Sequence, residues 1–126
     1  MENALRYEME KAIPALKGEL YPTNAPETAK KAYLVYARLG ADRIKTLEGY
    51  TNKQALSYMF SIMAPRHEEM KSLTDKVEGL LLSLAKKHIG KDKVVFVEDV
   101  SINNIEETYE FNLKKNRGII DFTIYI

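Results

Sequence analysis

Residues 65–90 read PRHEEMKSLTDKVEGLLLSLAKKHIG, and this stretch carries the clearest structural signal in the chain. A proline opens it, as is common in the first turn of a helix. Glu68 and Glu69 fall in the expected first turn, and Lys86 and Lys87 fall in the expected last turn. Both ends therefore complement the helix dipole, and the glycine just beyond them is a typical stop signal. The stretch predicts one long helix.

The predicted helix, residues 66–89, carries its apolar side chains on one side. They recur at spacings of three and four, which is the period of a helix that packs one face on a neighbouring layer. These residues are Met70, Leu73, Val77, Leu80, Leu81 and Leu84. We expect them to lie on the sheet face that bears Leu56, Phe60, Phe122 and Ile124.

The rest of the chain has the composition and alternation of strands. Five stretches qualify, and they are residues 33–39, 54–63, 94–100, 105–113 and 118–126. A polar turn around Asn103 and Asn104 is expected to separate the third strand from the fourth. A short amphipathic helix, ended or kinked by Pro14, precedes them all. The order α-β-β-α-β-β-β predicts a two-layer α+β fold, in which one long and one short helix pack on an antiparallel sheet.

Composition fits one domain over residues 1–126 and excludes several kinds of chemistry. The net charge is +1 and there is no cysteine, which removes disulfide scaffolds, thiolate metal sites and cysteine nucleophiles. His67 and His88 would stand about 30 Å apart on one helix, too far to share a metal. No glycine-rich phosphate loop is present. We predict no enzymatic activity, no cofactor and no metal. The acidic N-terminus and the lack of a long apolar run predict a protein made in the cytoplasm, without a membrane span.

The connection between the first two strands, residues 41–53, is much longer than a usual hairpin loop. Long loops without structure of their own are often functional. We expect this one to be mobile in the free subunit and to contact a neighbouring subunit or another partner. The residues proposed for that contact are Asp42, Arg43, Lys45, Glu48, Tyr50 and Lys53.

Acidic and basic side chains are segregated along the last third of the chain. The acids are Glu98, Asp99, Glu106, Glu107 and Glu110, with no Lys or Arg among them. The flanking basic residues are Lys86, Lys87, Lys91 and Lys93 on one side and Lys114, Lys115 and Arg117 on the other. These groups are either solvated faces of a sheet or complementary patches that bring identical copies together head to tail.

Several motifs resemble the tail-terminator or tail-completion proteins of long-tailed bacteriophages and prophages. The motifs are Leu20-Tyr21-Pro22, Ala25-Pro26-Glu27, the strand Tyr33-Leu34-Val35-Tyr36, the long loop, and the closing run Arg117-Gly118-Ile119-Ile120-Asp121-Phe122-Thr123-Ile124. The resemblance covers most of the chain, and its motifs consist of packing and turn residues.

The resemblance implies a structural protein of the virion tail, assembled in the bacterial host cytoplasm. Such a protein forms a ring, typically of six copies, on the tail tube, stops its growth and presents a surface to the head connector. DNA would pass through without specific binding, and the acids of residues 98–110 would line the channel or a subunit interface. Three alternatives remain: another neck protein of the same phage, a small bacterial ligand-binding or regulatory domain, and a metal-dependent hydrolase.

Overall fold

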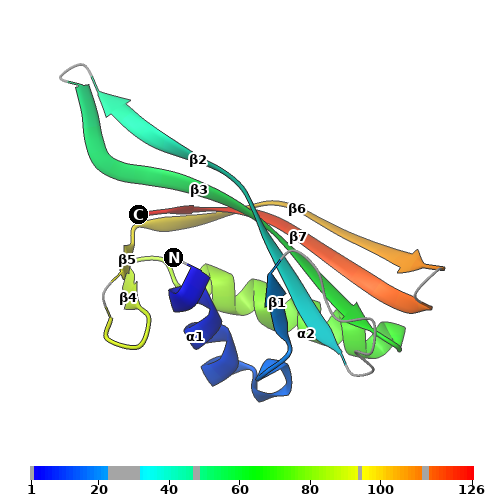
Figure 1. Ribbon diagram of the computed structural model, residues 1–126. Helices are drawn as coiled ribbons and strands as arrows, with labels where there is room; N and C mark the ends of the chain where they lie inside the picture. The colour runs from blue at the N-terminus through cyan, green and yellow to red at the C-terminus, as the bar shows by residue number, and fades with distance from the viewer. Residues whose placement is uncertain (1, 23–31, 47–48, 94, 112–113) are drawn as a thin grey trace.

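The computed structural model describes residues 2–22, 32–46, 49–93, 95–111 and 114–126 (Figure 1). The helical elements are α1 (Glu2–Ala12), the short 3-10 turn η1 (Pro14–Leu16) and α2 (His67–Ser83). The strands are β1 (Leu20–Pro22), β2 (Tyr33–Thr46), β3 (Gly49–Ala64), β4 (Lys87–Ile89), β5 (Val95–Val97), β6 (Asp99–Glu110) and β7 (Lys115–Tyr125). The α+β class is confirmed.

The strands form a five-stranded sheet in the order β1-β2-β3-β7-β6 and a separate two-stranded β4-β5 hairpin. All pairs are antiparallel except β1 with β2, which is parallel and makes the large sheet mixed. Both α1 and α2 lie on one face of this sheet, and neither covers the other face (Figure 1). The two-layer arrangement expected from the helix periodicity is therefore confirmed.

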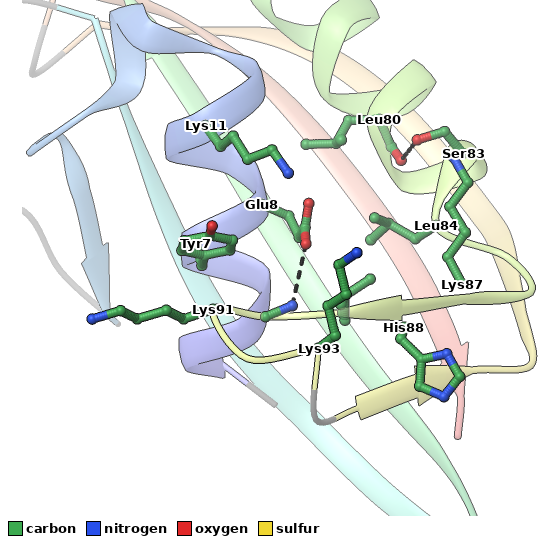
Figure 2. A pocket seen from close by; sticks show the side chains of 12 residues that line it. Tyr7, Glu8, Lys11, Leu80, Ser83, Leu84, Lys87, His88, Lys91 and Lys93 are labelled. Carbon is green, nitrogen blue, oxygen red and sulfur yellow. Dashed lines mark hydrogen bonds between the residues drawn. The ribbon is translucent and has the colours of Figure 1, made fainter.

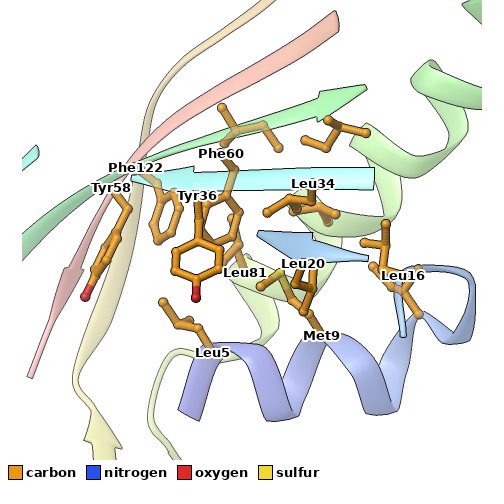
Figure 3. Close-up of a cluster of buried hydrophobic side chains, with 14 of the residues drawn as sticks. Leu5, Met9, Leu16, Leu20, Leu34, Tyr36, Tyr58, Phe60, Leu81 and Phe122 are labelled. Atoms are coloured by element: carbon orange, nitrogen blue, oxygen red, sulfur yellow. The ribbon is translucent and has the colours of Figure 1, made fainter. Parts of the chain in front are cut away.

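The core fills the space between the helices and the sheet (Figure 3). The Phe122 ring lies at its centre, 4.7 Å from the Phe60 ring and 5.7 Å from the Tyr58 ring. Leu5 and Met9 of α1 close it from the helix side. The predicted stripe of α2 is buried in this cluster except at Leu80, which is partly buried. Leu56, Phe60, Phe122 and Ile124 are buried with it, as predicted.

The predicted long helix is wrong at its C-terminal end. Instead of continuing to residue 89, α2 ends at Ser83, and Lys87 begins β4. Lys86 has a left-handed backbone with φ of 63°, and its N–H donates a hydrogen bond to the Val97 carbonyl at 2.7 Å. The reason is the burial of Ile89, which enters the core from a strand opposite β5. Lys86 and Lys87 lie beyond the end of α2, so they do not complement its dipole as predicted.

The polar turn predicted at Asn103 and Asn104 is also wrong, because β6 runs straight through it. The pairing with β7 shifts register between Ile102 and Asn104, which is the signature of a β-bulge. The extra residue, Asn103, donates from its amide nitrogen to Thr123 Oγ1 at 2.9 Å. Asparagine suits a bulge as well as a turn, so local composition could not separate the two.

The 41–53 connection is likewise not a loop. β2 extends to Thr46 and β3 begins at Gly49, so all but two of these residues belong to a long hairpin. The pairing is antiparallel, with register shifts between Arg38 and Gly40 and between Arg43 and Lys45. The hairpin projects from the body of the molecule (Figure 1). Outside the core nothing requires alternating apolar residues, so the strand pattern is missing there.

Candidate assembly surfaces

The projecting hairpin arm comprises residues 42–46 of β2 and 49–53 of β3. Its strands pair only with each other, since the pairing of β3 with β7 starts at Ala55 and is preceded only by the Gln54 to Ile126 hydrogen bonds. Two-stranded ribbons are marginally stable by themselves. The predicted contact residues on it are Asp42, Arg43, Lys45, Tyr50 and Lys53, while Glu48 lies outside the described residues. At the base of the arm, Lys53 Nζ lies 3.4 Å from Glu98 Oε1.

The structure divides the predicted acidic surface into two groups. Glu98 and Asp99 lie where β6 begins, beside the base of the arm. Glu106, Glu107 and Glu110 lie toward its far end, roughly 23 Å or more along the strand from Asp99. The five acids therefore do not form one continuous patch, whatever role each group has.

The far group belongs to a second projection, the β6–β7 tip, which we define as residues 106–111 and 114–117. β6 is an edge strand of the sheet. On the tip, Phe111 is 81% exposed and Tyr109 is 43% exposed, with their rings 5.1 Å apart. Large aromatic side chains are enriched in contact surfaces relative to the rest of a protein's surface.

The basic residues that follow β6 are used inside the same tip. Arg117 Nη1 lies 3.1 Å from Glu110 Oε1, and Arg117 also donates to Ser61 Oγ at 2.9 Å. The Lys115 ammonium lies 4.4 Å from the centre of the Tyr33 ring. Lys114 is exposed, with a left-handed backbone. This basic group therefore lies beside the acids that it was predicted to meet on another copy.

The other basic group lines a hollow beside the β4-β5 hairpin (Figure 2), which lies at the opposite side of the molecule from the tip (Figure 1). The cavity, of about 300 Å³, lies between α1, the end of α2 and the β4-β5 hairpin. Lys87, Lys91 and Lys93 line it together with Lys11 of α1. One acid lies among them, Glu8, whose carboxylate accepts the Gly90 N–H at 3.2 Å.

We call this hollow the lysine pocket. Lys86, the fourth predicted member of the basic group, is exposed outside its lining. The contribution of α1 was missed, because Lys11 lies far from residues 87–93 in the sequence and no motif connects them.

Side chains that could ligate a metal stand singly or in pairs in the described part of the chain. No three His, Asp or Glu side chains there gather as a metal site would require. His67 Nε2 lies 3.3 Å from Glu107 Oε2, and the His88 ring lies 4.9 Å from the Phe96 ring. Among the described helices, none is long and apolar enough to cross a bilayer.

Comparisons with known proteins give a structural likeness without a sequence match. No protein-family model matches the chain, and no curated protein matches it. One solved chain resembles this protein only weakly. Its TM-score is 0.45 at 14% identity, over 99% of this chain and 94% of its own, and it supports no inference. A chain in the solved virion of a native gene transfer agent particle has a TM-score of 0.71 at 12% identity. That likeness covers 99% of this chain and 92% of the other, and it shows that the two share a fold.

Proposed function

We propose that this protein is a structural component of a phage-like virion, in which it serves as the tail terminator. In this role copies of the chain form a ring, of six subunits, on the head-proximal end of the tail tube. Its partners are other copies of itself, the tail-tube protein and the head connector. The observation that carries the proposal is the nearly full-length likeness to a chain of a gene transfer agent virion.

The surface of the molecule supports an assembly role. The hairpin arm and the β6–β7 tip both extend past the part of the sheet that the helices cover (Figure 1). The strands of the arm pair only with each other over the described residues, and the tip exposes aromatic rings. Projections of this kind gain stability when a second protein covers them. The resemblance of its motifs to those of tail-terminator proteins favours the tail over other parts of the particle.

The location in the particle can be tested directly. We would label purified particles from the producing strain with gold-conjugated antibody against this chain and examine them by electron microscopy. The proposal expects label at the junction of head and tail. Label along the tail, label at its distal tip, or absence of the chain from particles would contradict it.

Deletion of the gene separates the tail terminator from another neck protein. Loss of a tail terminator should give over-long tails without heads, because nothing stops growth of the tube. Loss of a head-side neck protein should leave tails of normal length beside unjoined heads. A plasmid copy of the wild-type gene is the control and should restore normal particles.

A further inference from the structure

The two sides of the molecule carry opposite charges. The β6–β7 tip presents Glu106 and Glu107, and the lysine pocket presents Lys87, Lys91 and Lys93. Figure 1 places the tip and the β4-β5 hairpin at opposite sides of the molecule. The seven-residue step along β6 from Asp99 to Glu106 corresponds to about 23 Å. An ion pair between these groups within one chain is therefore impossible.

The lysines of the pocket lack anionic partners within the described residues. Lys87, Lys91 and Lys93 are exposed, and none of them forms an ion pair there. Gathering these ammonium groups around one hollow is electrostatically unfavourable, and the Glu8 carboxylate that lies among them offsets only part of the charge of four lysines. Lys93 has a φ of 53°, a conformation uncommon for residues other than glycine. The pocket is thus a cationic hollow.

The tip has matching properties. Glu106 accepts a hydrogen bond from the Asn104 amide, and Glu107 lies beside the exposed His67. As neighbours in a strand they point to opposite faces of the tip, and both are exposed, so the tip carries an acid on each face. Phe111 and Tyr109 add apolar area beside them. Next to the pocket, Phe96 is 40% exposed and contacts the His88 ring. Charge and apolar surface are therefore complementary between the two sides.

We infer that the β6–β7 tip of one copy docks at the lysine pocket of a second copy. The inference rests on the ring proposed above and names the contact between its subunits. Pairing two tips or two pockets would oppose like charges, so the contact must join different surfaces of the two copies. Such a heterologous contact repeats head to tail and closes into a ring when the rotation between neighbours divides a full turn.

A phosphate ligand in the pocket is less favoured. The Glu8 carboxylate repels phosphate and incoming glutamates alike, so charge alone does not decide between them. Phosphate offers no apolar surface to the exposed Phe96, whereas the tip brings Tyr109 and Phe111. The chain as a whole has a net charge of only +1, which gives no strong general attraction for phosphate. A second copy of the protein can supply carboxylates to the pocket, because every copy exposes Glu106 and Glu107. Apolar contact of the tip aromatics provides much of the affinity, and the charges set the register.

Charge reversal tests the contact. The tip variant is Glu106→Lys with Glu107→Lys, and the pocket variant is Lys87→Glu with Lys91→Glu. The matched control is Lys71→Glu with Lys76→Glu on the exposed side of α2. Circular dichroism would verify folding of each variant. Self-association would be measured by sedimentation equilibrium up to about 1 mM, at low and high salt, because screening weakens exposed charge pairs.

We expect the wild-type chain and the control to associate, more weakly at high salt. The tip and pocket variants should each associate about tenfold or more weakly. Mixing the two should restore association, because a lysine-bearing tip meets a glutamate-bearing pocket while the native surfaces meet each other. The variant with all four changes should associate by itself.

Three results would overturn the inference. They are a wild-type chain that stays monomeric to about 1 mM, variants that associate as the wild type does, and a mixture that does not recover. Binding of labelled duplex DNA that is lost in the pocket variant would instead assign the lysines to phosphates. If the association test fails while gold label is still found at the junction of head and tail, this contact is rejected and the proposed function is not. If association depends on these charges but particles carry no label, the proposed function is rejected and the contact is not.

Discussion

At Gly118 there is no room for a side chain between α2 and the sheet, and this gives a prediction of definite sign. A Cβ atom at this position would lie 3.0 Å from Met70 Sδ and still closer to Thr74 Oγ1. Thr74 is buried, and its hydroxyl donates to the Met70 carbonyl at 2.8 Å, so it has little freedom to move away. Glycine at residue 118 therefore sets the distance between the helix and β7.

Gly118→Ala should destabilise the protein. Where space allows, replacing glycine with alanine stabilises by about 0.4–1 kcal/mol, because the unfolded chain loses entropy. Overpacking a filled core costs roughly 1–3 kcal/mol. The net loss should be roughly 0.5–2.5 kcal/mol in the free energy of unfolding. Urea denaturation monitored by circular dichroism would measure it as a lower midpoint at unchanged slope.

Two variants make this test specific. Gly79 lies on the exposed side of α2 with nothing within 4 Å of an added Cβ, so Gly79→Ala should stabilise by about 0.8–1 kcal/mol. In a Thr74→Ala background the penalty of Gly118→Ala should largely disappear, because the obstructing hydroxyl is gone. A Gly118→Ala variant as stable as the wild type, or a penalty unchanged by Thr74→Ala, would refute the reasoning.

Three further outcomes are expected. Leu81→Ala should lower the free energy of unfolding by about 2–5 kcal/mol, because Leu81 is fully buried. Leu82→Ala should lower it by under about 0.5 kcal/mol, because Leu82 is 50% exposed. Equal losses for the two variants in urea denaturation would contradict the orientation of α2. Burial raises the pKa of Tyr58 to about 12, above the usual value near 10 that applies in the unfolded chain. The protein should therefore keep its full stability below pH 10 and lose part of it as the pH rises toward 12. Tyr58→Phe should reduce this alkaline fall in thermal midpoint, and a fall as steep as that of the wild type would contradict the role of Tyr58. In the free chain, amide hydrogens of the hairpin arm should exchange faster than those of residues 56–62. In assembled particles their exchange should slow down. Slow exchange of the arm in a proven monomer would contradict its role in binding a partner.

Features of the fold set by core burial were predictable from the sequence. The α2 stripe and the alternation of Ile120, Phe122 and Ile124 follow directly from burial against one layer, and the structure confirms both. Burial imposes a period on the sequence, and a period can be recognised without knowing the partner.

Features without such a period were mispredicted. Lysines followed by glycine are typical of a helix end, yet the same residues here turn the chain into β4. The hairpin arm projects beyond the layer that the helices cover, and its sequence carries no alternating apolar pattern. The lysine pocket requires Lys11 and residues 87–93 together, and only the tertiary fold brings them together. The segregation of acidic and basic residues is visible in the sequence. The sequence does not show that Arg117 and Lys115 make contacts within their own chain.

The engagement of Arg117 determines how the charges can act between copies. Because Arg117 binds Glu110 and Ser61, the basic residues after β6 stabilise the tip that carries the acids. Of the two basic groups, the lysines around the β4-β5 hairpin lie at a distance from those acids. A chain with nearly zero net charge thus has one acidic projection and one basic hollow, so a contact that pairs opposite charges must join different surfaces of two copies. Exposed ion pairs contribute about 0.2–1 kcal/mol each, so they select the orientation while the tip aromatics supply affinity. A subunit built in this way can remain dispersed until a tail tube holds several copies side by side, where a weak contact becomes sufficient.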